Sequence, residues 1–504
     1  MLTRLKVSGF KSLLDVDVRF GPFTCIAGTN GVGKSNLFDA IFFLSQLSDL
    51  PLNEAAHRVR GGDTSGVQSL FYQSRAGASQ VMTFEAEMIV PPRGLDDLGQ
   101  EAEASITFLQ YRLSLGYRED PRWGPLGSFE VLDEELRHIT KGEAHRHLLF
   151  PHSAKRWRSS VVAGERRAPY FVSTVAEGND RLVLLHQDGG SRGRPLRYAA
   201  ATLPRTVLSG ANAAESPTAL LARTEMRSWR MLQLEPSALR RSDPFTAPTR
   251  LGNDGSHLAA NLFHLERLES DASAAVLSEE IAEPSAGSGT VYSRIAGRLS
   301  ELVEDIHDLW VDRDERRELL TLMVQGWDGK SLPAPALSDG SLRFLALAVL
   351  ESDPRGEGLI CLEEPENGIH PDRIPAMLDL LQDIAVDVEE PTGADNPLRQ
   401  VIVNTHSPAV VNQVPEASLV MAIPREAISD GHRRQTVAFH GLEGTWREKD
   451  ETSASPMPLG RLLTYLNPVA PLEPGWRRRS TTASRRVVDR DDVQLLLPFG
   501  NKHA

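Results

Sequence analysis

One short stretch combines glycines, a lysine and a hydroxyl side chain at the spacing of a phosphate-binding loop. Residues 28–35 read GTNGVGKS, which matches the pattern G-x-x-x-x-G-K-[ST]. In such a loop the glycines let backbone amides face phosphate oxygens, the lysine reaches the β- and γ-phosphates, and the serine hydroxyl binds Mg²⁺. We therefore predict that ATP and Mg²⁺ are held here, by Gly28, Asn30, Gly31, Gly33, Lys34, Ser35 and Asn36.

Two adjacent carboxylates follow an apolar run later in the chain. The sequence GLICL, residues 358–362, leads directly into Glu363 and Glu364. Ligand-binding residues of parallel sheets lie at the carboxyl ends of the strands. At such an end Glu363 can hold Mg²⁺, and Glu364 can polarise the water that attacks a clamped phosphoanhydride. Alone, the pair is equally typical of a solvated strand end. Together with a phosphate loop, it indicates ATP hydrolysis.

The elements around the loop occur in the order that such a site requires. Apolar residues alternate over 5–10 and over 14–20, and residues 23–27 form a short apolar strand that ends in glycine. After the loop, apolar residues recur at the spacing of one helix face: Leu37, Ile41 and Leu44. Strand, loop and helix are thus predicted in succession, with phosphates at the helix N-terminus.

The hydrophobic patterns divide the whole chain into five segments. We predict an N-terminal ATPase lobe over 1–80, a mainly β insertion over 81–250, a helical subdomain over 251–330, a C-terminal ATPase lobe over 331–425, and a partly irregular appendage over 426–504. In the third segment a helical spacing of apolar residues continues from Tyr292 to Leu309. This seam covers fewer than about three heptads, which is too short for a long coiled coil.

Four motifs, in this order, resemble the ABC-type ATPases of the RecF, SMC and OLD kind, especially their bacterial OLD-like branch with little coiled coil. The motifs are GTNGVGKSN, LSDGSLR, LEEPENGIHP and NTHSP, and the opening MLTRLKVSGFKSLLDV resembles the first hairpin of the family. The resemblance covers residues 1–75 and 250–425. It implies an α/β fold of the P-loop NTPase type, with a mixed sheet, an antiparallel β insertion and a helical subdomain. It also implies a homodimer that forms through sandwiched ATP.

The resemblance assigns roles to individual residues. Ser338 and Gly340 fall where the signature loop of the family caps the γ-phosphate of the opposite protomer. Glu363 falls at the metal-side acid, where Asp is commoner, and Glu364 falls at the catalytic base. His406 falls at the switch histidine, which senses the γ-phosphate.

Two further family features have uncertain counterparts in this sequence. Gln68 and Gln73 are both candidates for the glutamine that contacts Mg²⁺ in the family. Residues 487–491, VVDRD, resemble the Asp-x-Asp element of OLD nucleases. No strand-borne glutamate precedes that element at a suitable distance. We therefore predict that the chain alone does not cut DNA.

The composition is that of a soluble globular protein, with 40% hydrophobic and 24% charged residues. Its net charge of −13 opposes non-specific binding to nucleic acid. Cys25 and Cys361 lie in apolar runs, which favours reduced core cysteines and a cytoplasmic location. No window reaches the roughly 18 uncharged apolar residues of a membrane span, so we expect no membrane contact.

A basic stretch keeps a DNA role open. Residues 145–160, HRHLLFPHSAKRWRSS, interleave cations with Phe150 and Trp157, so Trp157 could stack on a base. The alternative is a solvated positive loop, with its histidines in a surface turn. Two function classes follow. One is a DNA-directed ATPase in repair or in defence against phage and plasmids. The other is a nucleotide-gated switch that holds a separate effector protein and does not contact DNA.

Overall fold

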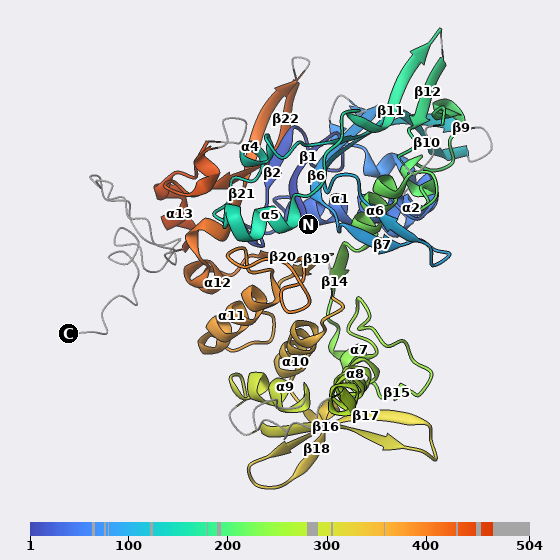
Figure 1. The fold of residues 1–504 in the computed structure, drawn as a ribbon. Coiled ribbons are helices and arrows are strands. Elements are labelled where there is room, and N and C mark those ends of the chain that lie inside the picture. The colour runs from blue at the N-terminus through green and yellow to red at the C-terminus, as the bar shows by residue number, and fades with distance from the viewer. Residues whose placement is uncertain are drawn as a thin grey trace. The chain divides into compact units, whose positions relative to one another are not determined.

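The computed structural model describes the chain as two compact units (Figure 1). Unit 1 comprises Met1–Arg230, Gly358–Cys361 and Val386–Ala504, and unit 2 comprises Met231–Glu357 and Leu362–Ala385. Each unit is therefore assembled from separate stretches, whereas the five predicted segments are consecutive. The described residues are 1–62, 66–74, 77–78, 80–120, 124–178, 180–188, 193–279, 291–303, 306–356, 358–429, 432–449 and 455–466.

Unit 1 contains an eight-stranded sheet in which every neighbouring pair is antiparallel. The predicted β insertion is thereby confirmed, and it extends the sheet of the N-terminal hairpin. In sheet order the strands are β13 (Leu196–Ala199), β12 (Asp180–Leu185), β11 (Tyr170–Glu177), β10 (Gly124–His138), β9 (Phe108–Asp120), β6 (Val81–Ile89), β1 (Leu2–Ser8) and β2 (Val16–Arg19).

One face of this sheet packs against helix α1 (Lys34–Leu47), which starts at the phosphate loop. Phe43 of the helix lies with its ring centroid 5.8 Å from those of Phe10, Phe84 and Phe129. All four side chains are buried, and burying an aromatic side chain contributes about 1.5–3 kcal/mol. This apolar contact fixes the helix, and hence the loop before it, on the sheet.

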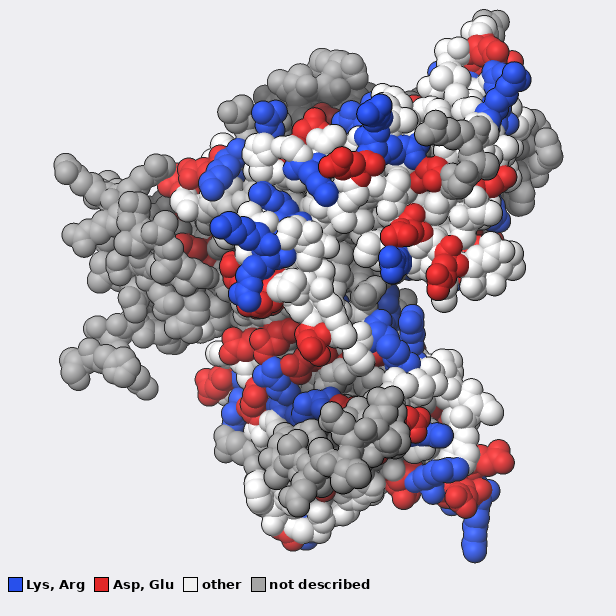
Figure 2. Space-filling view, in the orientation of Figure 1, with Lys and Arg blue, Asp and Glu red and all other residues white. Residues whose placement is uncertain are grey.

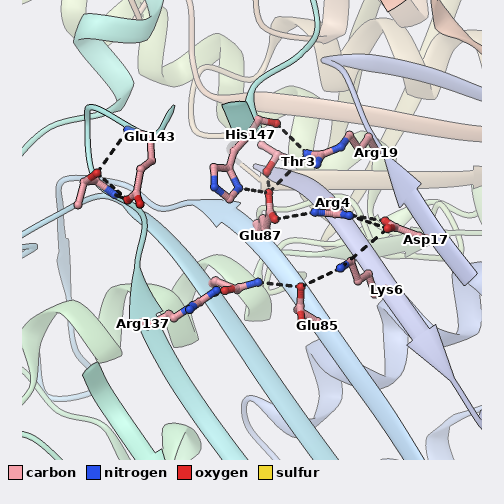
Figure 3. A network of polar contacts seen from close by, with 12 residues as sticks. Thr3, Arg4, Lys6, Asp17, Arg19, Glu85, Glu87, Arg137, Glu143 and His147 are labelled. Carbon is pink, nitrogen blue, oxygen red and sulfur yellow. Dashed lines mark hydrogen bonds and ion pairs between the residues drawn. The ribbon is translucent and has the colours of Figure 1, made fainter. Parts of the chain in front are cut away.

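The other face of the sheet is charged, because successive strand residues point to opposite faces. Arg4 contacts Asp17 at 2.6 Å and Glu87 at 3.3 Å, and His147 Nδ1 lies 2.9 Å from the Glu87 carboxylate (Figure 3). Burial raises the pKa of Glu87, but His147, Arg19 and Arg4 outweigh it and lower that pKa overall. The charges on this face therefore largely neutralise one another.

A second, mixed sheet carries the phosphate loop. In sheet order its strands are β14 (Arg230–Leu232), β19 (Gly358–Glu363), β20 (Arg399–Thr405), β3 (Phe23–Ala27), β21 (Leu419–Ser429) and β22 (His432–Gly441). Strand β3 is parallel to both β20 and β21, and β22 pairs antiparallel with β21. The α/β fold class is confirmed. The predicted appendage over 426–504 contains regular structure in β22, where the consecutive buried residues Thr436 to Phe439 hold the strand in the sheet.

Unit 2 combines helices with a small antiparallel sheet. The helices are α7 (Pro236–Leu239), α8 (Leu258–Glu279), α9 (Val291–Ser300), α10 (Asp339–Ser352) and α11 (Ile374–Ile384). Arg298 of α9 joins two of the others through Glu351 of α10, at 2.6 Å, and Asp383 of α11, at 2.5 Å. The strands are β15 (Asp243–Pro244), β17 (Leu319–Gly326), β16 (Ile306–Asp314) and β18 (Ser331–Pro333).

The predicted helical seam ends earlier than expected. Residues 306–314 form strand β16, paired antiparallel with β17, so the helix prediction is wrong from Ile306 to Leu309. A short apolar run is compatible with the repeat of a helix and with that of a strand. The long-range pairing with β17 decides in favour of the strand, which the local pattern could not reveal.

The basic stretch is not a solvated loop. Trp157 is fully buried in a cluster with Phe150 and Trp446, and the rings of Phe150 and Trp157 lie 5.5 Å apart. Trp157 is therefore not exposed for stacking on a base. The expectation of a surface turn is also wrong for His147, which binds Glu87, whereas His145 is exposed. The apolar side chains anchor the stretch, and its cations point outward.

The remaining described elements are short. The helices are α2 (Leu52–Arg58), α4 (Ala144–His147), α5 (Ser159–Val161), α6 (Pro217–Arg227), α12 (Pro408–Gln413) and α13 (Leu459–Leu466), and the strands are β4 (Gln73–Ser74), β5 (Gly77–Ala78), β7 (Arg93–Leu95) and β8 (Glu101–Glu103). Both cysteines are buried and neither is part of a disulfide, as predicted. Among the described helices, none has the length and apolar character to cross a membrane. The Asp-x-Asp at 489–491 lies outside the described residues.

Candidate nucleotide-binding site

The phosphate loop lies between β3 and α1, as the sequence predicts. Its conformation depends on glycine at several positions. Gly31 and Gly33 have φ angles of 76° and 111°, in the left-handed region that glycine adopts without strain. At Gly28 the reason is space, because an added Cβ would lie 2.6 Å from the carbonyl oxygen of Ala422 in β21. The loop is therefore pressed against the neighbouring strand.

Lys34 occupies the centre of the loop. Its Nζ donates hydrogen bonds to the carbonyl oxygens of Gly28, at 2.7 Å, and Thr29, at 2.9 Å. The side chain is only 6% exposed. It lies in the first turn of a 14-residue helix, whose N-terminal amides and dipole favour anions. A buried cation, a helix N-terminus and a glycine-rich backbone together suit a polyphosphate.

Two side chains that the sequence patterns missed, Ser12 and Arg60, also support the loop. Asn36 Nδ2 donates to Ser12 Oγ at 2.7 Å, so the opening hairpin supports the start of α1. Arg60 donates to the Ser35 carbonyl oxygen at 3.1 Å and to Asp39 Oδ1 at 2.9 Å. Ser12 lies in the opening stretch that resembles the family, which is a usable signal. Arg60 belongs to no motif.

His406 follows β20 at the same edge of the sheet. Thr405 of β20 pairs in register with Ala27 of β3, so His406 and Gly28 both leave the sheet at neighbouring strand ends. Two segments more than 370 residues apart in the chain are thereby brought together in unit 1. The role of His406 in sensing the γ-phosphate stays a prediction.

The signature motif caps a helix in unit 2. Ser338 is the N-cap of α10, and its Oγ accepts a hydrogen bond from the Ser341 amide at 3.2 Å. Gly340 packs directly on the loop that follows Glu364, because an added Cβ would lie 2.2 Å from the Gly368 carbonyl oxygen. The LSDGS and LEEPENG motifs therefore meet within this unit.

Glu364 has an unusual backbone. Its φ of 48° is left-handed, which glutamate adopts only at a cost of about 1–3 kcal/mol. Its Oε2 accepts a hydrogen bond from Asn367 Nδ2 at 2.9 Å, and Arg343 donates to the Asn367 carbonyl oxygen at 2.5 Å. Strained backbone of this kind is frequent at reacting residues. The turn therefore holds Glu364 in a defined orientation.

The donors for Mg²⁺ are oxygens, as that ion prefers. Ser35 is half-buried behind the loop, and Glu363 is the half-buried last residue of β19. Mg²⁺ commonly takes one or two protein oxygens and completes its shell with phosphates and water, so each of these side chains carries a donor that suits the ion. Within the described ranges, no group of three His, Cys, Asp or Glu side chains could hold a metal by itself. Gln68 and Gln73 are both exposed, and both remain candidates.

Two family models match the chain, one over each part of the site. Residues 4–50, which include the phosphate loop, match a model described as "AAA domain". Residues 215–412 match one described as "AAA domain, putative AbiEii toxin, Type IV TA system". The second range contains Ser338, Gly340, Glu363, Glu364 and His406.

Curated relatives are the DNA replication and repair proteins RecF of Porphyromonas gingivalis and Paenarthrobacter aurescens. The first is 46% identical over 46 residues, which is 9% of this chain and 13% of that protein. The second is 39% identical over 62 residues, which is 12% of this chain and 16% of that protein. The match thus spans less than a fifth of either relative.

Solved structures with some likeness are Smc heads. One is bound to the C-winged helix domain of ScpA and is 14% identical, with a TM-score of 0.43 over 88% of this chain and 98% of that one. Another, bound to the C-terminal domain of ScpA derived from Pyrococcus furiosus, is 13% identical, with a TM-score of 0.41 over 88% and 96%.

The phosphate loop and the two matched models assign the chain to the P-loop ATPases, and a short part of it is similar to RecF. Within that class its longer match is to the AAA domain described for AbiEii. The site residues named from the sequence all lie inside the two matched ranges, apart from Gln68 and Gln73.

Proposed function

We propose that this ATPase hydrolyses ATP with Mg²⁺ and uses the cycle as a switch in a DNA-related process. The observation that carries the proposal is the phosphate loop itself, with buried Lys34 on one side and His406 at the next strand end. In this mechanism Lys34 and the loop amides bind the β- and γ-phosphates. Bound Mg²⁺ neutralises phosphate charge. Ser35 and Glu363 are the residues that would hold it.

Glu364 is proposed as the general base. The carboxylate accepts the proton of the attacking water and aligns that water with the γ-phosphorus. Its hydrogen bond from Asn367 fixes the orientation of the carboxylate. His406 is proposed to contact the γ-phosphate, so that the site responds to the loss of that group.

We further propose that two copies sandwich ATP. Ser338 and the first amides of α10 would cap the γ-phosphate bound by the partner chain, since a helix N-terminus attracts anions. The exposure of Ser338 and Asp339 supports this role, because a capping surface must reach another molecule. Particle size in ATP and in ADP tests the dimer. A size that ATP leaves unchanged in a hydrolysis-deficient variant would contradict it.

The DNA-related role is supported by the matched relatives, which are named for DNA replication and repair. A role in repair and a role in defence against phage or plasmids are both compatible with this DNA-related role. An OLD-like origin of the chain is compatible with it as well. The test is the rate of ATP hydrolysis with and without linear duplex DNA at fixed salt, because phosphate contacts depend on salt. We expect a stimulation that falls as salt rises.

The alternative is a regulatory ATPase that holds a separate effector protein without touching DNA. Two observations favour it. Trp157 is buried and unable to stack. The face drawn in Figure 2 intersperses small groups of basic and acidic side chains, in a chain of net charge −13. An ATPase rate unaffected by DNA, with a co-purifying protein released by ATP, would support this alternative over the first.

A further inference from the structure

One arginine of unit 2 contacts the signature turn from a distant part of the chain. Arg240 directly follows helix α7, lies 99 residues before Asp339, and belongs to none of the motifs. Its Nε donates to the Pro335 carbonyl oxygen at 3.2 Å, and its Nη2 donates to the Leu337 carbonyl oxygen at 3.1 Å. The same Nη2 donates to Asp339 Oδ1 at 2.6 Å. A single guanidinium therefore holds the residues on both sides of Ser338.

Helix α7 is itself fixed against α10, which lies beside it (Figure 1). Ala238 and Leu239 of α7 are buried. Arg343 of α10 donates from its Nε to the Leu234 carbonyl oxygen, just before α7, at 3.0 Å. Contacts thus run in both directions, from α10 to the chain before α7 and from Arg240 to the start of α10. The guanidinium of Arg240 therefore has a defined position.

The contacts of Arg240 suit a role in orienting the turn. A planar guanidinium presents its donors as a fixed fork, so it defines the direction of each acceptor that it binds. Leu337 and Asp339 are the immediate neighbours of Ser338, the N-cap of α10. Their orientation sets that of the Ser338 side chain and of the first amides of α10.

The charge of Asp339 conflicts with the role proposed for this turn. Asp339 is the first residue of α10, and its side chain is 55% exposed. A carboxylate there interacts favourably with its own helix. Under the proposed function, however, the same helix end caps the γ-phosphate bound by a partner chain, and two negative groups at one helix end repel each other. Arg240 compensates the charge of Asp339 from 2.6 Å away.

We propose that Arg240 is a positioning residue of the signature turn. It orients the turn and neutralises Asp339, so that Ser338 and the start of α10 can approach the γ-phosphate of a second copy. The inference rests on the proposed ATP sandwich and adds a residue to it. A symmetric dimer contains two such turns, so a change at Arg240 acts twice on the dissociation constant of the dimer.

The experiment measures that dissociation constant by sedimentation equilibrium in saturating ATP and Mg²⁺. Every protein carries Glu364→Gln, so that ATP is not consumed. Arg240→Met keeps an unbranched apolar stem and removes the guanidinium. We expect the dissociation constant to rise at least about tenfold, since a loss of about threefold at each of two turns multiplies. The ATP affinity of the monomer should stay near that of the parent, because the phosphate loop lies in unit 1.

Arg241→Met is the matched control. Arg241 is the next residue in the chain and is exposed. Its replacement removes the same charge from the same segment, and the dimer should be as tight as that of the parent. A dimer that weakens as much in Arg241→Met as in Arg240→Met would overturn the inference, because net charge alone would then explain the effect.

Asp339→Asn, added to Arg240→Met, tests the charge compensation. Asparagine keeps the size of Asp339 and removes the charge that Arg240 no longer balances. We expect the dimer to tighten again at least about threefold, because the repulsion of the phosphate is gone. An arginine that only supports the fold would show no such recovery. The absence of recovery would therefore overturn the inference.

Arg240→Lys keeps the proposal testable if Arg240→Met lowers the Tm. Lysine retains the charge but replaces the planar fork with a single ammonium, so the dissociation constant should rise about two- to fivefold. A parental dissociation constant in both Arg240 variants would overturn the inference and leave the sandwich standing. If Glu364→Gln with Arg240 intact forms no dimer in ATP, both the sandwich and the role of Arg240 are wrong.

Discussion

The two units hold their site residues in different ways. In unit 1 the phosphate loop is enclosed by regular structure, with Lys34 buried and Gly28 pressed against β21. In unit 2 the signature serine is exposed, and Glu364 lies half-buried in a turn with a left-handed backbone. Under the proposed function this difference corresponds to a division of roles, in which the loop of unit 1 would bind the phosphates and Glu364 and Ser338 of unit 2 would act on them. Variants in the loop of unit 1 should therefore impair ATP binding, and variants in unit 2 should impair ATP turnover.

Lys34→Ala should give the largest effect, and it should act on binding. Loss of the buried cation removes two or more charge-assisted hydrogen bonds to phosphate, at about 1.5–3 kcal/mol each. We expect ATP affinity to fall roughly 10²- to 10⁴-fold, as measured by calorimetry. ATP binding near the parental affinity would contradict the assignment of phosphate binding to unit 1, because the phosphates would then be held elsewhere.

Glu364→Gln should impair turnover and spare binding. The amide keeps the shape and the contact with Asn367 but cannot take the proton of water. Steady-state hydrolysis should slow at least about 10²-fold while ATP stays bound. The trapped protein should be dimeric by light scattering.

Ser338→Arg in the same background is the control for the dimer. A large cation at the exposed N-cap of α10 should prevent the partner from approaching and return the trapped protein to monomers. A dimer that survives this change would mean that the signature residue does not lie at the interface.

Gly340→Ala tests how closely the two motifs of unit 2 must approach. The added Cβ would meet the Gly368 carbonyl oxygen at 2.2 Å, so the Glu364 turn must move. We expect slower hydrolysis with near-parental ATP affinity, and a loss of stability of about 1–3 kcal/mol. Gly297→Ala is the matched control in the same unit, because nothing lies within 4 Å of its Cβ position. That variant should keep full activity.

The pH dependence of stability should differ between the units. Glu134 is fully buried in unit 1, and burial raises its pKa to about 7, against 4.5 for an exposed glutamate. An acid with a raised folded pKa stabilises the fold below its unfolded pKa, and that contribution is lost as pH rises through the folded value. The free energy of unfolding of this region should fall by about 2 kcal/mol from pH 5 to pH 7.

Hydrogen exchange measures this loss locally. The Glu134 carboxylate accepts hydrogen bonds from the Val207 and Leu208 amides. After correction for intrinsic rates, protection of these amides should fall with pH, while α10 in unit 2 keeps its protection. Glu134→Gln does not titrate and should flatten the dependence. Equal pH profiles in the two units would contradict the prediction.

Local sequence patterns were sufficient to predict elements that consecutive residues form in succession. The phosphate loop, the strand before it and α1 could be predicted, because residues 23–47 form them in succession. Strand β16 could not be predicted, because its assignment depends on pairing with β17. The burial of Trp157 depends on Trp446, almost 290 residues later. Arg60 belongs to no motif, so only its position in space reveals its contacts.

The carbonyl oxygens of the phosphate loop compete with an incoming ligand for the Lys34 ammonium. The carbonyl oxygens of Gly28 and Thr29 hold the ammonium at 2.7 and 2.9 Å, so an incoming anion must match what it displaces. An ion with one charge, such as acetate or bicarbonate, gains too little from Lys34 alone. Under the proposed function a triphosphate would engage the lysine, the loop amides and the metal at once. The two backbone carbonyls would thus set a minimum strength of binding, which a triphosphate exceeds more easily than a singly charged anion.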